Sequence, residues 1–205
     1  MSFRKEIKFK LSSSDSISLK SQLLDCGMKV IYPKRQVNSC YFDNYDYLFL
    51  HQSLDGVVPR KKIRLRWYND NYLIKKETKI TSIEGRFKIA EDYKLNKFPN
   101  FSKLTLFDKN YGNLTPSILI KYSREYYKYK GLRLTFDGNI LYQNLRSILS
   151  KEYIDNERVM EIKTSIDTPD DFINKYISFP STEFSKYVRG CIFCSTSTHL
   201  DQSSI

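Results

Sequence analysis

The sequence has few of the residues that build disulfide, zinc or histidine-based sites. Among its 205 residues, the cysteines are Cys26, Cys40, Cys191 and Cys194. They are too few and too scattered for a disulfide framework in a chain of this size. Cys191 and Cys194 form a lone CxxC pair with no second such pair, which favours two ordinary reduced thiols over a zinc or redox site. Histidine occurs only as His51 and His199, and we expect both at the surface.

Long apolar runs are also missing. No uninterrupted apolar segment approaches the roughly eighteen residues that a membrane-spanning helix needs. The first ten residues, MSFRKEIKFK, lack the apolar core of a signal peptide. We therefore expect a cytoplasmic protein without a membrane span. The many Lys, Tyr, Asn and Ile residues are typical of an AT-rich genome and favour a bacterial source.

Acidic residues are scarce beside basic ones. The chain has 23 Asp and Glu residues against 34 Lys and Arg residues, a formal net charge of +11 and a pI near 9.4. This charge predicts an anionic partner, which leaves nucleic acid, a membrane surface and phosphorylated molecules or polymers open. The length and the 40% apolar content predict one domain with a substantial core. We place it at residues 1–194, followed by a polar tail at 195–205.

Charged and apolar residues alternate in several segments, as expected of strands with one polar face. In the segment RKKIRLRWY, one face carries Arg60, Lys62, Arg64 and Arg66, and the other carries Lys61, Ile63, Leu65 and Trp67. Strands are predicted at 3–10, 37–43, 60–68, 71–80, 84–92, 117–129, 131–142 and 159–164. Helices are predicted after Ser14 as far as Gly27 and from Pro169, and residues 44–54 are predicted to be helical or irregular. About eight strands with few helices indicate a mainly β (α+β), antiparallel architecture.

The polar face recurs from strand to strand, and it carries acids as well as bases. The sets that share a face are Lys75, Glu77 and Lys79; Glu84, Arg86 and Lys88; Arg133, Thr135 and Asp137; and Glu161 and Lys163. One interpretation is a solvated surface. The other is a closed β-barrel whose polar face lines a tunnel, with helices packed outside. Crowded cations in a tunnel would need carboxylates or a polyanion with metal to compensate them.

An ordered set of short motifs resembles the VTC domain. The motifs are R-x-E-x-K at Arg4, Glu6 and Lys8; K-x-R-x-R at Lys62, Arg64 and Arg66; E-x-K at Glu77 and Lys79; YSREYY around Arg124; LRLTFD with Arg133; MEIK with Glu161; and FSKY with Ser185 and Lys186. The VTC domain is the catalytic domain of vacuolar transporter chaperone polyphosphate polymerases, within the triphosphate tunnel metalloenzyme (CYTH-like) superfamily. The resemblance spans about residues 3–190.

The resemblance implies a tunnel barrel that transfers the γ-phosphoryl group of ATP onto a polyphosphate chain with Mn²⁺ or Mg²⁺. It implies catalytic contacts to phosphate from Lys8, Arg64, Arg66, Lys79, Arg124, Arg133 and Lys186. Further phosphate-binding positions are Lys62, Lys163 and Ser185, and the metal would be held by Glu161 with Glu6 as a possible second carboxylate. Hydrolytic relatives usually begin with E-x-E-x-K, and Arg4 at the first acidic position favours the polymerase branch.

Several alternatives stay open. The activity could be that of a tunnel triphosphatase, or the chain could be a non-catalytic module that binds polyphosphate or nucleic acid, although nucleic acid is not the expected partner. Glu161 could form an internal salt bridge with Lys163 or an arginine, and Arg124 or Arg133 could pair with Glu125 or Asp137. Ser185 and Lys186 could cap a helix. The tyrosines at 122, 126, 127 and 129 could stack bases, but packing is the commoner role on strands.

Overall fold

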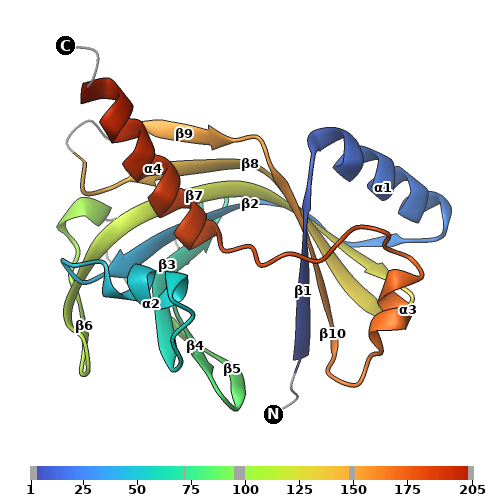
Figure 1. The fold of residues 1–205 in the computed structure, drawn as a ribbon, viewed down its shortest axis with the longest axis horizontal. Coiled ribbons are helices and arrows are strands. Elements are labelled where there is room, and N and C mark those ends of the chain that lie inside the picture. Colours follow the sequence, from blue (N-terminus) through green and yellow to red (C-terminus); the bar gives the residue numbers. More distant parts are fainter. Residues whose placement is uncertain (1–3, 72, 95–99, 148–150, 203–205) are drawn as a thin grey trace. The chain divides into compact units, whose positions relative to one another are not determined.

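The computed structural model describes residues 4–71, 73–94, 100–147 and 151–202, and these residues form a mainly β fold (Figure 1). The strands are β1 (Arg4–Leu11), β2 (Lys29–Asp43), β3 (Arg60–Tyr68), β4 (Lys75–Ser82), β5 (Gly85–Asp92), β6 (Leu106–Asp108), β7 (Gly112–Tyr129), β8 (Leu132–Asn144), β9 (Glu152–Asp155) and β10 (Arg158–Ser165). The helices are α1 (Ser13–Asp25), α2 (Leu48–Leu54), the 3₁₀ turn η1 (Phe101–Lys103), α3 (Asp170–Asn174) and α4 (Lys186–Gln202). In this part of the chain, no helix combines the length and apolar character needed to cross a membrane.

The strand pairing confirms the antiparallel, mainly β fold class. The hydrogen-bonded order is β1-β10-β8-β7-β2-β3-β4-β5, with β6 beside β7 and β9 beside β8. The following strand pairs are antiparallel: β1–β10, β10–β8, β2–β3, β3–β4, β4–β5 and β6–β7. β1 and β5 are the two ends of this order, so closure of the sheet into a barrel stays a prediction.

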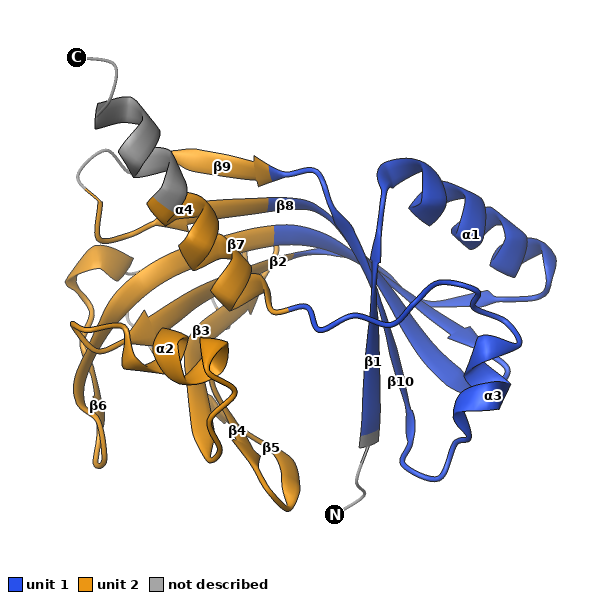
Figure 2. Cartoon of the chain, viewed as in Figure 1, with its two compact units in different colours: residues 1–36, 122–140, 155–184 blue, residues 37–121, 141–154, 185–205 orange. Residues whose placement is uncertain are grey.

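The chain divides into two compact units (Figure 2). Unit 1 comprises residues 1–36, 122–140 and 155–184, and unit 2 comprises residues 37–121, 141–154 and 185–205. The long strands β2, β7 and β8 each contribute one part to unit 1 and the other part to unit 2. Each unit is described by itself below.

In unit 1, the helices α1 and α3 cover the apolar face of the strands β1, β10, β8 and β7. The helices contribute Leu19, Leu23 and Ile173, and the strands contribute Phe9 and Ile162, to one buried cluster. The α1 helix begins where the Ser12 side chain accepts a hydrogen bond from the backbone N–H of Asp15 at 3.0 Å, as an N-cap residue should. It ends at Gly27, whose φ of +95° suits a residue without a β-carbon.

In unit 2, buried Asp43 fixes the start of α2. Its carboxylate accepts hydrogen bonds from the backbone N–H groups of Phe49 at 2.9 Å and Leu50 at 3.0 Å, and from the hydroxyl of Tyr187 in α4 at 2.5 Å. The α4 helix lies close to the sheet, because a β-carbon added at Gly190 would meet Tyr142 and Ile118 at 2.5 and 2.6 Å. Asp43 and Gly190 therefore hold the two helices of this unit in place.

Most predicted elements are present, but the sequence pattern missed several. β2 begins at Lys29 rather than near residue 37, and β6 and β9 were not expected. α4 extends as far as Gln202, so part of the expected polar tail is helical. The irregular-or-helical segment 44–54 contains the seven-residue helix α2.

Candidate functional site

Three lysines face one another across adjacent strands of unit 2. The register places Lys62 of β3 opposite Lys79 of β4, and Lys79 opposite Lys88 of β5. Like charges directly opposite one another on a sheet are destabilising. The register therefore brings three positive charges together on this part of the sheet, and we call these residues the lysine row.

Glu77 is the carboxylate next to the lysine row. Arg64 donates two hydrogen bonds to its Oε2, from Nε at 2.8 Å and from Nη2 at 2.6 Å, and Nη1 of Arg66 lies 3.8 Å from the same oxygen. Lys88 Nζ lies 2.5 Å from Oε1. Burial would raise the pKa of Glu77, but these three cations outweigh it and hold the pKa well below its usual range. Three cations therefore share one carboxylate.

Tyr41 shows how strongly positive this region is. Nη1 of Arg64 donates a hydrogen bond to the Tyr41 hydroxyl at 2.6 Å, and Nε of Arg66 donates one to Ser39 at 3.0 Å. Burial by itself would raise the pKa of the Tyr41 phenol, but Arg64, Arg66 and Lys79 outweigh it and lower the pKa to about 7. Arg64 and Arg66 therefore act on both Tyr41 and Glu77.

The beginning of α4 contributes two further predicted residues of unit 2. Lys62 Nζ donates a hydrogen bond to the Ser185 hydroxyl at 3.0 Å, and that hydroxyl also accepts one from the backbone N–H of Val188 at 3.4 Å. Lys186 is the first residue of α4. The capping role that the sequence left open for Ser185 is thus present, and it places Ser185 beside the lysine row. Lys61, on the other face of β3, pairs with Asp108 at 2.9 Å.

In unit 1, the polar residues of β1, β10 and β8 form two rows. The first row is Lys8, Glu161 and Thr135, and the second is Glu6, Lys163 and Arg133. Each row contains one carboxylate and at least one base, and Lys163 and Arg133 lie opposite one another in the second row. Lys8 Nζ also donates a hydrogen bond to the backbone oxygen of Phe184 at 2.7 Å, while Arg133 is exposed.

Arg124 of β7 joins two carboxylates of unit 1. Its Nε and Nη2 each donate a 2.6 Å hydrogen bond to Asp137, and Nη2 lies 3.7 Å from Oε2 of Glu161. Burial disfavours the charged form of Glu161, but Arg124 and Lys163 outweigh it and hold the pKa of this carboxyl well below its usual range. The ion pairs that the sequence left open as alternatives for Arg124 and Glu161 therefore exist.

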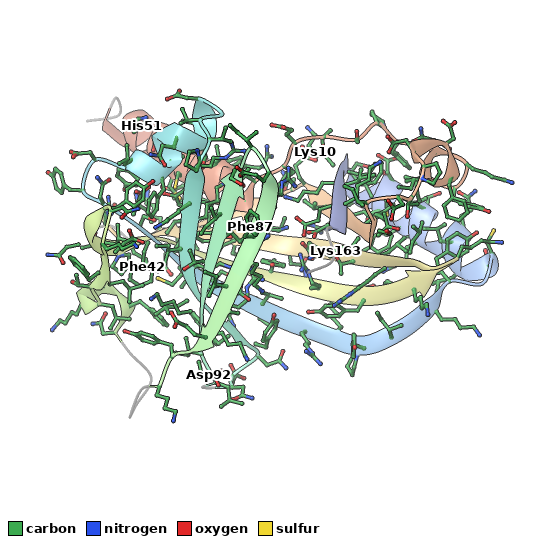
Figure 3. All side chains as sticks on the ribbon, turned by 90° about the horizontal axis from the view of Figure 1, so that it is seen from below. Lys10, Phe42, His51, Phe87, Asp92 and Lys163 are labelled. Atoms are coloured by element: carbon green, nitrogen blue, oxygen red, sulfur yellow. The ribbon has the colours of Figure 1, made fainter. Side chains whose placement is uncertain are left out.

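Lys163, labelled in Figure 3, contacts two carboxylates. Its Nζ lies 2.9 Å from Oε1 of Glu6 and 3.1 Å from Oε1 of Glu161. No group of three or more His, Cys, Asp or Glu side chains with metal-binding geometry occurs within the described ranges. Mg²⁺ is commonly held by one or two carboxylates together with substrate phosphates. Glu6 and Glu161 would supply two such carboxylates if a divalent ion took the place of their contact with Lys163.

Several other expectations can be compared with the structure. The tyrosines Tyr122, Tyr126, Tyr127 and Tyr129 are all buried, which favours packing over base stacking. Cys191 and Cys194 are buried and form no disulfide in the described part of the chain, and burial raises the pKa values of their thiols to about 12 and about 11. The sequence did not single out Lys88, Tyr41 and Asp137 as site residues. The alternation pattern could have found Lys88 and Asp137, since each shares a face with predicted residues.

The VTC domain family model matches residues 3–194. The chain belongs to the VTC domain family. No curated protein matches the sequence.

Solved structures show the same fold at low sequence identity. A conserved hypothetical protein from Pyrococcus furiosus is 14% identical, with a TM-score of 0.57 over 90% of this chain and 99% of the other. A candidate adenylate cyclase from Bacillus halodurans is 15% identical, with a TM-score of 0.57 over 90% and 94%. A candidate adenylate cyclase from Vibrio parahaemolyticus is 13% identical, with a TM-score of 0.52 over 90% and 95%. At these identities the likeness concerns the fold.

Proposed function

We propose that this VTC domain transfers the γ-phosphoryl group of ATP onto a polyphosphate chain. The observation that carries the proposal is the clustering of the lysine row with Arg64 and Arg66, five cations of which Arg64, Arg66 and Lys88 share the carboxylate Glu77. A chain of phosphates is the ligand that matches such a surface, because each phosphate unit of the polymer carries negative charge. The match of the family model over residues 3–194 supports the same conclusion.

The residues of unit 2 bind and neutralise phosphate in this proposal. The guanidinium groups of Arg64 and Arg66 offer forked donors that suit two oxygens of one phosphate. Lys62, Lys79 and Lys186 act as point charges along the polymer, and the Ser185 hydroxyl can donate a hydrogen bond to it. Arg64 and Arg66 are already held by Glu77, Tyr41 and Ser39, so they lose little side-chain freedom when a phosphate binds.

The residues of unit 1 act on the transferred group. Lys8, Arg124, Arg133 and Lys163 offset the charge on the phosphoryl oxygens, where charge compensation provides most of the catalysis of phosphoryl transfer. A divalent ion, Mn²⁺ or Mg²⁺, held by Glu161 with Glu6, would supply further charge neutralisation. Glu161 suits this role because its pKa is held well below its usual range and it stays ionised.

The transfer needs no general base. The bond between the γ-phosphorus and the β–γ bridging oxygen breaks, and its electron pair leaves with ADP. A terminal oxygen of the polyphosphate, already ionised near neutral pH, forms the new bond to the γ-phosphorus. No proton has to be removed from the acceptor, so the described polar clusters can support the reaction without a histidine. Transfer to water would require a proton to be removed, which distinguishes a triphosphatase from a polymerase.

The direct test is to incubate the purified protein with ATP and Mn²⁺ and to separate polyphosphate from free phosphate. We expect ADP together with lengthening polyphosphate. Free phosphate without polymer would indicate a triphosphatase, and triphosphate binding without turnover would indicate a binding module. We place the activity in the bacterial cytoplasm, where ATP is abundant and thiols such as Cys40 stay reduced.

A further inference from the structure

Thr135 of β8 is a buried polar residue that has no role in the proposed function. Thr135 is only 2% exposed, and its Oγ1 has no hydrogen-bond partner among the described residues. A buried hydroxyl without a partner destabilises a fold, whereas an apolar side chain of the same shape does not. The threonine therefore provides a hydrogen-bonding group at a position where folding alone would favour valine.

The surroundings of Thr135 are those of the phosphate-directed residues in unit 1. The register places it directly opposite Glu161, which is itself opposite Lys8. On β8, Arg133 lies two residues before Thr135 and Asp137 lies two residues after it, so all three side chains share one face of the strand. Side chains directly opposite one another have their β-carbons about 4.5–5.5 Å apart. The hydroxyl thus belongs to the same polar face as the two carboxylates and the cations.

Arg124 contacts two carboxylates that neighbour Thr135 in the sheet. Its Nη2 contacts both Asp137 at 2.6 Å and Glu161 at 3.7 Å. Asp137 is two residues along from Thr135 on one strand, and Glu161 is opposite Thr135 on the next. A guanidinium that touches both carboxylates therefore lies beside Thr135. The contact to Glu161 is an ion pair longer than a hydrogen bond.

We propose that the Thr135 hydroxyl donates a hydrogen bond to a phosphate oxygen of a bound triphosphate or polyphosphate, beside Arg124. This inference rests on the proposed function and adds a neutral donor to its charged phosphate contacts. A hydroxyl suits this position because it adds a donor without adding another positive charge to a face that already holds Lys8, Lys163 and Arg124. In the protein without phosphate, the same hydroxyl remains a source of instability.

The test is the substitution Thr135→Val, which keeps the shape and removes the hydroxyl. We expect the variant without ligand to melt about 2–4 °C higher than the wild type, the size of change typical for a modest stabilisation of a domain of this length. We expect its affinity for tripolyphosphate, measured by calorimetry in buffer with a chelator, to fall about tenfold. The matched control is Thr164→Val on the adjacent strand β10, where the hydroxyl pairs with Thr168 at 2.6 Å. That variant should lose stability and keep its tripolyphosphate affinity.

Each other outcome contradicts a distinct part of the account. If the wild type binds tripolyphosphate and Thr135→Val binds it with the same affinity, the role of Thr135 is overturned. The proposed function would still stand. A lower melting temperature would show that the hydroxyl has a structural partner and would also overturn it. A loss of affinity that appears only when Mn²⁺ is added would assign the hydroxyl to the metal's water shell instead of to phosphate. A wild type that does not bind tripolyphosphate would overturn the proposed function and this inference together.

Discussion

The polar faces of the two units differ in how their charges are balanced. In unit 1, four cations lie on a face with three carboxylates, and the residues are Lys8, Arg124, Arg133, Lys163, Glu6, Asp137 and Glu161. In unit 2, three cations share the carboxylate Glu77 and two more lie in the same strand register; the residues are Arg64, Arg66, Lys88, Lys62 and Lys79. Both sets lie on strands of the same antiparallel type. The difference is therefore in the side chains and not in the backbone.

This contrast separates two tasks within one reaction. A face with excess positive charge holds a polyanion but cannot by itself hold a metal ion, because cations repel one another. A face with interleaved carboxylates can hold a divalent ion and orient cations around a reacting group. We therefore expect the polar face of unit 2 to bind phosphate without metal and that of unit 1 to depend on a divalent ion. The following substitutions test that division.

The largest effect is expected from Glu161→Gln in unit 1. The substitution keeps the size of the side chain and removes its charge, so ATP turnover with Mn²⁺ should fall at least about 100-fold. Triphosphate binding without metal should persist or tighten, since a negative charge has left the site. The two measurements are turnover and calorimetry. Glu125→Gln is the control, because Glu125 pairs with Lys20 at 2.9 Å on the other face of β7; equal losses in both variants would contradict the assignment of Glu161.

Arg64→Ala and Arg66→Ala in unit 2 should weaken binding rather than chemistry. Each should lower triphosphate affinity by about 1.5–3 kcal/mol, the usual contribution of a charge-assisted hydrogen bond. Lys76→Ala is a better control than Lys61→Ala, because Lys61 pairs with a mostly buried Asp108 whereas Lys76 pairs with the exposed Glu91. Calorimetry at fixed salt measures the affinities. Equal losses in all three variants would show that the direction of the side chains does not matter.

Glu77→Gln should sharpen the contrast, because it makes unit 2 more positive. Triphosphate affinity should rise on the order of tenfold, while the melting temperature falls because Arg64 loses its charged partner. The pKa of Glu77 is held below its usual range in the folded protein, so its contribution is present at neutral pH and is lost as pH falls. The difference in melting temperature between variant and wild type should therefore shrink below about pH 4. A difference that does not vary with pH would contradict this electrostatic origin.

The smallest effect concerns Tyr41. Its folded pKa is lowered to about 7, so ultraviolet absorbance should show a tyrosinate titration near neutral pH that is absent in Tyr41→Phe. Bound triphosphate should shift this titration to higher pH, because added negative charge disfavours the phenolate. The lowered pKa also means that the Tyr41 contribution to stability grows as pH rises above 7 and is lost below it. The same titration in wild type and Tyr41→Phe would refute the electrostatic account of unit 2.

The alternation of residues along single strands could predict much of this molecule. It predicted β3 from Arg60 to Tyr68 with the observed bounds, and it placed Arg64 and Arg66 on one face and Lys61 on the other. It also predicted β10 around Glu161 and the start of α3 after Pro169. These features depend on local side-chain pattern and backbone geometry, which a sequence contains directly.

Features that depend on register and tertiary contacts could not be predicted. The lysine row exists because Lys62, Lys79 and Lys88 are opposite one another, and their order in the sequence does not fix that register. The first half of β2 was missed because Pro33 and the charges around it weaken the strand pattern. Whether Arg124 pairs with Asp137 or with Glu125 was open for the same reason, since both acids lie near it in the hairpin.

The most direct test of the central claim follows the γ-phosphoryl group of ATP. The wild-type protein would be incubated with ATP labelled at the γ-phosphate, Mn²⁺ and an acceptor polyphosphate of defined length, and the products separated by gel electrophoresis. We predict that the label enters the acceptor, which lengthens by one phosphate for each ADP formed. Label released as free phosphate beside an acceptor of unchanged length would contradict the account.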